Sequence, residues 1–418
     1  MSGYGIEDLF NILPIVFVLG WALVLLMVEA FSKNRDLTVV LTVVGLAGAL
    51  TMAIMQFGTE TTAFKDMLMV DGYSTFIDIL LLGSALLAIG LSYDYGKRMG
   101  WVRGEYYVLM LFSIAGAMLM ASAANLIVVF LALELLSIPL YIMAAFVPNN
   151  SASEEAGLKY FLLGAFSGGF VLYGVALVYG ATGATNLMEV VSVAVKSQSP
   201  LMLLIGAAMI LIGLGFKVAV VPFHMWTPDV YQGSPTSVTA FMAVVAKAGG
   251  FAALLRVFIA AFPTLSTDLA PVLSTLVVLT LVVGNLAAIA QKNVKRMLAY
   301  SSISHAGFIL MAFVTYGNAE VYPDAVAAVL FYLLAFAVTS FGSWAVVIAL
   351  ETAEGKGLEL DDYNGLGKKY PMLSVAMLVF MLSFAGVPPT LGFGGKFFLF
   401  RTVLEGGYTW LAVIGVLA

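Results

Sequence analysis

Four ionisable side chains stand inside long apolar stretches, where acid–base chemistry could proceed away from bulk water. Glu134 follows a run of valine, phenylalanine and leucine, and Lys217, Lys247 and Lys396 lie in similar surroundings. A charge at the centre of a bilayer costs about 2.5–3.5 kcal/mol on insertion scales. Four such charges together cost on the order of 10 kcal/mol, which rivals the stability of a whole domain. These groups must therefore be paired, neutral or hydrated, and groups in that state can pass protons.

The composition places these residues in a membrane protein. Of 418 residues, 62% are hydrophobic and 10% are charged, whereas an ordinary soluble domain has about 25% charged residues. We therefore expect an all-α polytopic membrane protein. The chain has no cysteine and two histidines, which excludes disulfides, thiolate zinc sites and iron–sulfur clusters. We expect it to bind no metal or cofactor, and no basic run suggests nucleic acid.

Apolar segments of about 20 residues, the length that a bilayer core requires, recur along the whole chain. They predict thirteen membrane-spanning helices, at about 9–31, 37–57, 74–95, 105–123, 125–147, 156–180, 202–221, 236–261, 271–290, 298–316, 325–350, 371–399 and from 408 onward. The last has only about ten residues before Ala418. We therefore expect an incomplete C-terminus, with a total of 13 to 14 spans.

Lysine and arginine set the expected orientation, because they concentrate in the inside loops of membrane proteins. With the N-terminus outside, eleven fall in inside loops: Lys33, Arg35, Lys97, Arg98, Arg103, Lys292, Lys295, Arg296, Lys356, Lys368 and Lys369. Four fall outside: Lys65, Lys196, Arg256 and Arg401. This asymmetry predicts an N-terminus outside and supports the helix count.

Two of the spans are interrupted by proline, which removes a backbone donor and breaks a helix. The breaks lie near Pro222 in the seventh span and near Pro388 in the twelfth. Since they are five spans apart, two successive five-helix units have opposite orientations in the membrane, as in inverted-repeat transporters. We predict three N-terminal helices in residues 1–103, a first repeat in 104–265 and a second in 266–418. A chance pair of prolines is the alternative.

The buried charges have functional and structural interpretations. Glu134 has no opposite charge nearby in sequence, and Lys217 is its natural partner; a structural salt bridge is the alternative. Lys247 has no obvious carboxylate partner, and glycines after it admit a neighbouring helix or water. Snorkelling to the membrane surface is its alternative role, and Lys396 could snorkel or cap a helix.

The two histidines and one further lysine complete the candidate set. His224 follows the first break and either lines water or caps the broken helix. His305 follows a run of serines and suits a proton relay, because histidine titrates near neutral pH. Lys159 lies near the inside end of its span and is a possible site residue or an interface charge. We expect Asp229 to hold the loop after the first break.

Three longer strings resemble a known family. They are Gly213–Pro235, which contains Lys-x4-Pro-Phe-His-x-Trp-Thr-Pro-Asp; Lys295–Gly307; and Ala385–Lys396. Together they resemble the antiporter-like, proton-pumping membrane subunits of respiratory complex I, NADH:quinone oxidoreductase. The resemblance covers nearly the whole chain and is greatest to the N subunits of this family. Lysine at position 396 argues against the M subunits, which carry glutamate.

The resemblance implies roles for individual residues. Glu134 is similar to the glutamate that pairs with a lysine, here Lys217, and Lys247 resembles the central lysine of the eighth helix. His305 and Lys396 match the exit side of the hydrophilic axis. His224 matches the histidine beside the first break.

The resemblance also implies a non-redox subunit of a proton-translocating oxidoreductase in the bacterial inner membrane. Its partners are the neighbouring antiporter-like subunit, the small membrane subunits and the lipid bilayer. NADH, FMN, iron–sulfur clusters and quinone are then used in other subunits. Two alternatives remain: a subunit of a multisubunit Na⁺/H⁺ antiporter, and a non-pumping structural membrane subunit.

Overall fold

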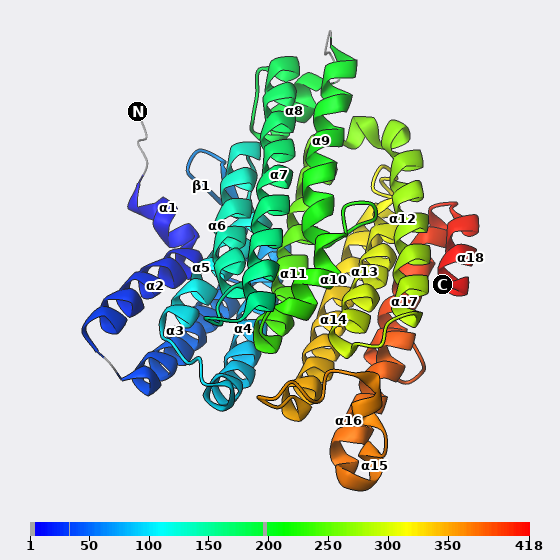
Figure 1. Ribbon diagram of the computed structural model, residues 1–418. Helices are drawn as coiled ribbons and strands as arrows, with labels where there is room; N and C mark the ends of the chain where they lie inside the picture. Colours follow the sequence, from blue (N-terminus) through cyan, green and yellow to red (C-terminus); the bar gives the residue numbers. More distant parts are fainter. Residues whose placement is uncertain (1–4, 33, 195–198) are drawn as a thin grey trace.

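The computed structural model describes residues 5–32, 34–194 and 199–418 and is almost entirely helical (Figure 1). Lys33 and Lys196, which entered the charge count above, lie outside these residues. The helices of the first half are α1 (Ile6–Asn11), α2 (Leu13–Phe31), α3 (Arg35–Met55), α4 (Gly72–Met99), α5 (Glu105–Ser122), α6 (Leu126–Ala144), α7 (Ser151–Thr182), α8 (Leu187–Ala194), α9 (Pro200–Val218) and α10 (Trp226–Gly233). Those of the second half are α11 (Thr236–Ala261), α12 (Ser266–Ile289), α13 (Val294–Phe313), α14 (Tyr322–Leu350), α15 (Leu366–Lys369), α16 (Pro371–Ala385), α17 (Leu391–Glu405) and α18 (Thr409–Leu417), with 3₁₀ turns at Pro263–Leu265 and Leu360–Tyr363.

The all-helical membrane fold is confirmed. Among the described residues, ten helices are long and apolar enough to cross a membrane: α2 to α7, α9, α11, α12 and α14. Three further predicted positions are occupied by α13, by the broken pair α16 and α17, and by the short α18. α13 is more polar than the ten because it carries Lys295, Arg296 and three serines.

Some short elements were not predicted. β1 (Thr61–Ala63) and β2 (Leu68–Val70) form an antiparallel hairpin between α3 and α4, with Thr62 opposite Met69. The short helices α1, α8 and α10 lie at the ends of longer ones. A three-residue strand carries too little hydrophobic pattern to be recognised in a sequence this apolar.

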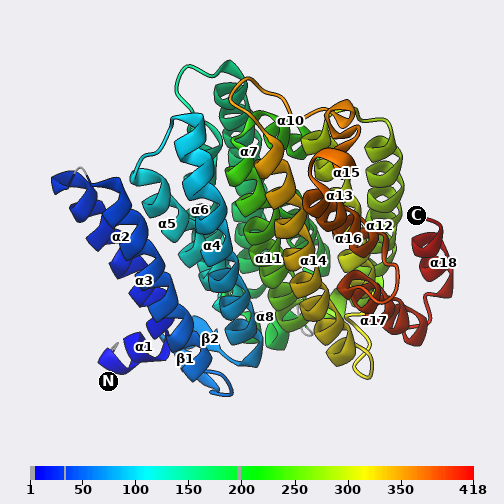
Figure 2. The ribbon, with the colours of Figure 1, turned by 90° about the horizontal axis from the view of Figure 1, so that it is seen from below.

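α11 is the central helix of the molecule. It contacts α4, α5, α6, α9, α13 and α14. The apolar stretch of 18 residues that qualifies it as a membrane span is entirely buried. Figure 2 shows the helices following one another from α2 and α3 at one end to α18 at the other, with α11 between them. Lys247 on α11 therefore lies in the interior of the protein, and snorkelling to the membrane surface is ruled out for it.

Both predicted helix breaks are present. α9 ends at Val218 and is followed by Ala219 with φ of 64°. α16 ends at Ala385, and Gly386 follows with φ of 81°. The free backbone groups find partners: Val221 N donates to Thr280 Oγ1 at 3.0 Å, and Trp226 Nε1 donates to the Phe216 carbonyl at 3.0 Å. Irregular backbone at membrane depth is thus enclosed in protein, as the physics of the bilayer requires.

Close helix packing depends on Gly116 of α5. A Cβ atom at this position would lie 2.3 Å from the backbone nitrogen of Leu136 on α6. We expect Gly116→Val to force α5 from α6 and to destabilise the fold by about 1–3 kcal/mol. Thermal unfolding in detergent measures this. Gly83→Ala is the control, because nothing lies within 4 Å of a Cβ added at this position and alanine favours helix. An equal loss of thermal stability in both variants would contradict the expectation.

Candidate functional site

Lys217 is buried at the end of α9, with 2% of its surface exposed. Its Nζ donates to Ser137 Oγ on α6 at 2.8 Å and to the Tyr160 hydroxyl on α7 at 3.2 Å. The ammonium also lies 5.4 Å from the centre of the Tyr160 ring, which adds cation–π attraction. The lysine is therefore held by neutral oxygen acceptors and an aromatic face rather than by a carboxylate.

The predicted direct pair of Glu134 and Lys217 is absent from this structure. No ion pair within 4.0 Å joins the two among the described residues. Glu134 is half-buried on α6, and its Oε1 lies against Gly168 of α7. The two charges still interact electrostatically. Ser137, one turn further along α6, takes the lysine in place of the glutamate.

Lys247 is the central group, 2% exposed in the middle of α11. Its Nζ donates to the carbonyl of Ser302 on α13 and lies 5.9 Å from the Phe336 ring centre. The glycines after it admit neighbouring helices, as predicted: a Cβ at Gly249 would lie 3.0 Å from Ala117, and one at Gly250 would lie 3.3 Å from the Lys217 stem. Small residues thus bring α9 and its lysine against the helix that carries Lys247.

His305 lies on α13 one turn beyond Ser302 and is 5% exposed. Its Nδ1 and the Tyr332 hydroxyl of α14 share a hydrogen bond of 2.6 Å. The Phe384 ring centre is 4.7 Å from the imidazole. His305 interacts electrostatically with both Lys247 and Lys396, so the imidazole is coupled to both lysines.

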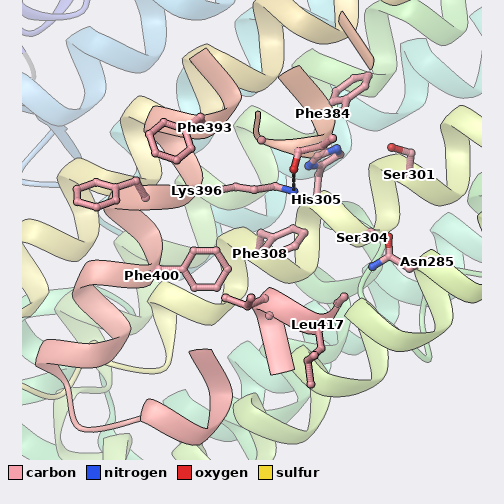
Figure 3. Close-up of a pocket in the computed structure, with 16 residues that line it drawn as sticks. Asn285, Ser301, Ser304, His305, Phe308, Phe384, Phe393, Lys396, Phe400 and Leu417 are labelled. Carbon is pink, nitrogen blue, oxygen red and sulfur yellow. Dashed lines mark hydrogen bonds between the residues drawn. The ribbon is translucent and has the colours of Figure 1, made fainter. Parts of the chain in front are cut away.

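Lys396 extends from α17 toward the second helix break (Figure 3). Its Nζ donates to the free carbonyl of Ala385 at 3.3 Å and lies 4.2 Å from the Phe308 ring centre. It borders a cavity of about 710 Å³, also lined by His305, Asn285, Ser301 and Ser304. The capping contact expected for this lysine is present, and the same ammonium faces a cavity with polar walls.

Two other candidates, Lys159 and His224, lie apart from the groups just described. Lys159 pairs with Glu155 at 2.7 Å and with Asp229 at 2.8 Å. Asp229 also accepts from Arg296 of α13 at 2.7 Å. It therefore joins α10 to α7 and α13; the segment after the first break, which was expected to be a loop, is the short helix α10 at this position. His224 is half-buried, and its Nδ1 has no hydrogen-bond partner among the described residues.

Polar partners of the row were not singled out from the sequence. Ser137, Tyr160, Ser302 and Tyr332 contact the charged groups directly. Serine and tyrosine are common in apolar helices, so their type alone carries no signal. Within the described parts of the chain, no group of three His, Cys, Asp or Glu side chains could hold a metal ion.

The row can be followed across five helices, from Glu134 on α6 through Lys217 on α9 and Lys247 on α11 to His305 on α13 and Lys396 on α17. Each neighbouring pair is linked by electrostatic interaction or by helix contact. Carboxylate, amine and imidazole groups can each bind and release a proton, and they hold no redox electrons. The chemistry available to this site is proton transfer.

Comparison with known proteins gives the family. The family model for the transmembrane part of NADH:quinone oxidoreductase and Mrp antiporters matches residues 123–418. The NADH-quinone oxidoreductase subunit N of Trichlorobacter lovleyi is 47% identical over 406 residues, which cover 96% of this chain and 82% of the relative. The subunit N of Chloroflexus aggregans is 45% identical over 416 residues, which cover 98% of this chain and 84% of the relative.

Solved structures agree with the family match. A chain of respiratory complex I from Thermus thermophilus superposes with a TM-score of 0.82 at 38% identity, covering 97% of this chain and 86% of that one. A chain of the Mrp complex from Dietzia has a TM-score of 0.85 at 22% identity, which shows a shared fold. The chain therefore belongs to the subunit N family of NADH-quinone oxidoreductases, the antiporter-like membrane subunits of complex I.

Proposed function

We propose that this chain translocates protons in the membrane arm of an NADH:quinone oxidoreductase. The observation that carries the proposal is the row of Glu134, Lys217, Lys247, His305 and Lys396, in which the three central members are buried and the two end members are half-buried. Buried charges are a poor source of stability, since apolar replacements often do as well. A row of them across the interior is better explained by transfer of charge.

The two halves of the chain supply two half-channels in this proposal. Residues 104–265 form the first repeat and residues 266–418 the second, inverted relative to it. Each repeat has its broken helix in the fourth position, α9 with α10 and α16 with α17. Lys247, in the last helix of the first repeat, contacts α13 of the second, so it joins the two half-channels.

Lys217 acts as a gate between two partners. In the observed arrangement it is bound to Ser137 and Tyr160, and in the alternative arrangement it pairs with Glu134. Ion pairing at 4 Å is worth about 4 kcal/mol at an effective dielectric constant of 20. Moving one charge against 100 mV costs about 2.3 kcal/mol, so the switch is large enough to control the charge on Lys247.

A proton then passes from Lys247 through His305 to Lys396 and leaves on the outside. Glu134 senses the charge state of the neighbouring subunit. Lys159 and His224 lie outside the transfer row and position the helix break. The N-terminus lies outside in the bacterial inner membrane, and the driving energy comes from NADH, FMN, iron–sulfur clusters and quinone in other subunits. The partners are the neighbouring antiporter-like subunit and the small membrane subunits.

The hydrogen bond between His305 and Tyr332 gives one test of the relay. Tyr332→Phe removes the hydroxyl but keeps the ring, and we expect proton translocation to fall several-fold because the imidazole loses the group that orients it. Tyr316→Phe is the control, since its hydroxyl bonds the Phe262 carbonyl away from the row. Proton uptake by sealed membrane vesicles measures both. Unchanged uptake in Tyr332→Phe would remove the histidine from the pathway.

Purification from the native membrane in mild detergent tests the assignment itself. We expect flavin-containing and iron–sulfur subunits to accompany the chain and NADH-driven quinone reduction to follow it. Partners that are all membrane-embedded, with no redox activity, would assign the chain to the Na⁺/H⁺ antiporters. The shared fold of the Mrp chain makes this the second candidate, and the identity to subunit N relatives favours the first.

A further inference from the structure

A second cavity, of about 580 Å³, lies on the face where the lysine-rich loops gather. Its walls include Arg98, Lys356, Lys369 and Asp362, together with Glu351. Glu351 follows the last residue of α14 and is 8% exposed. A cavity with charged walls is therefore lined in part by a buried carboxyl that the transfer row does not include.

Further polar groups continue inward from Glu351. The Tyr95 hydroxyl lies against its carboxyl and accepts a hydrogen bond of 3.2 Å from Thr236 N at the start of α11. Lys295 is 2% exposed and interacts electrostatically with Glu351. Its Nζ donates to the Ser234 carbonyl at 2.5 Å. Lys295 therefore has a carbonyl as its direct partner, with a carboxyl in the same buried cluster.

α13 connects this cluster to Lys247. Lys295 and Ser302 are seven residues apart, so they share one face of the helix about 10.5 Å apart along its axis. The Ser302 carbonyl accepts the hydrogen bond from Lys247. The Tyr231 hydroxyl of α10 interacts with the Ser302 side chain.

Unpartnered polar atoms mark the same path independently. Ten buried side-chain atoms of the described residues have no hydrogen-bond partner, and five of these belong to this region. They are Glu351 Oε2, Thr236 Oγ1, Ser237 Oγ, Tyr231 OH and Ser302 Oγ. Buried polar atoms without protein partners are normally satisfied by water. Several such atoms thus lie between the cavity and Lys247, where water could bind to them.

From this arrangement we infer that the cavity admits protons from the lysine-rich face, with Glu351 as the first acceptor and Lys295 as the relay to Lys247. The inference rests on the proposed proton translocation and names its entry site. A hydronium ion gives its proton to the Glu351 carboxylate and leaves water. The carboxyl passes the proton along the hydrated path to the neutral amine of Lys295, which becomes ammonium and releases it toward Lys247.

Substitution of Glu351 tests the first step. We expect Glu351→Gln to lower NADH-driven proton uptake by the intact complex about tenfold or more, because the amide cannot bind and release the proton. Glu351→Asp keeps the carboxylate and should retain most of the uptake. Glu354→Gln is the matched control, since it removes a carboxylate from the same loop at an exposed position. Normal uptake in Glu351→Gln would overturn the entry site.

Thiol labelling tests the path without relying on turnover, because the chain has no cysteine of its own. Thr236→Cys should react with a small positively charged methanethiosulfonate added from the lysine-rich side. Ser153→Cys is the control, equally buried near the same face but with its hydroxyl bonded to the Ala144 carbonyl. We expect Thr236→Cys to react about tenfold faster than Ser153→Cys, or more. The extent of reaction is measured as the increase in the mass of this chain. Equally slow reaction at both positions would exclude the path.

The two proposals fail in different ways. If Lys247→Ala stops proton uptake while Glu351→Gln is normal and Thr236→Cys stays unreactive, protons enter elsewhere and the proposed function stands. If Lys247→Ala itself takes up protons normally, the proposed function fails whatever the labelling result.

Discussion

Lys247→Ala is expected to lower NADH-driven proton translocation about tenfold or more while the complex still assembles. In the proposed pathway its side chain joins the two halves of the chain, because it is buried on α11 and donates to the Ser302 carbonyl of α13. Alanine leaves no group that can take a proton at this point. A tenfold loss corresponds to about 1.4 kcal/mol in the barrier, which is less than the cost of placing an unassisted charge at this depth.

The control for this variant is Lys292→Ala. Lys292 is a lysine of the loop before α13 and lies outside the row. Native gel electrophoresis shows whether both complexes assemble, and proton uptake is compared at equal complex content. A Lys247→Ala complex that assembles and translocates at the wild-type rate would show that the junction is not needed.

Arg256→Met is expected to destabilise the fold by about 3 kcal/mol or more, because removal of one partner leaves the other charge buried. Arg256 makes a bidentate pair with Asp71 at 2.5 and 2.8 Å and also donates to the Ala121 carbonyl. Its side chain is 10% exposed. It thereby joins α11 to the start of α4 and the end of α5.

Asp71 caps α4 through a hydrogen bond from Ser74 N. Burial alone would raise the pKa of Asp71, but Arg256 outweighs it and holds this pKa below the usual value. The folded protein thus gains stability from the ionised carboxylate at neutral pH and loses it as the pH falls below about 3.9. In Arg256→Met this contribution should vanish, so acidification below about pH 3.9 should no longer remove the stability that the pair supplies to the wild-type protein.

Arg401→Met provides the comparison for the stability loss. Arg401 pairs with Glu405 one turn away on α17, with both side chains well exposed, and such pairs contribute at most about 0.5 kcal/mol. Thermal unfolding of the two purified complexes measures the difference. Similar melting temperatures for Arg256→Met and Arg401→Met would show that the buried pair does not hold α4, α5 and α11 together.

Most of the fold could be predicted from the sequence because membrane spans are read from length and hydrophobicity. The two broken helices were also evident, since proline cannot supply the missing donor. The hairpin of β1 and β2 was not predicted, because three-residue strands leave no periodic pattern. The span at α13 was predicted to begin at 298, after Lys295 and Arg296, because the residues that follow are mostly apolar, whereas the helix begins at Val294.

The site was only partly predictable. The charged members were identified from their apolar surroundings, which is a property of the local sequence. The partner of Lys217 was not, because Ser137 and Tyr160 lie 80 and 57 residues away and compete with Glu134 for the same ammonium. Lys295 was assigned to a loop and Glu351 was not singled out, yet both are buried. Their burial depends on how α10 and α14 end, which depends on tertiary packing.

Protons translocated per NADH oxidised, measured side by side in Lys217→Ala and Lys247→Ala complexes in sealed vesicles, test the central claim most directly. The row of ionisable groups predicts that both variants assemble and that both lose proton translocation, with coupled quinone reduction suppressed in parallel. If both variants translocate protons at the wild-type ratio and rate, the buried charges are assembly contacts and the relay does not exist.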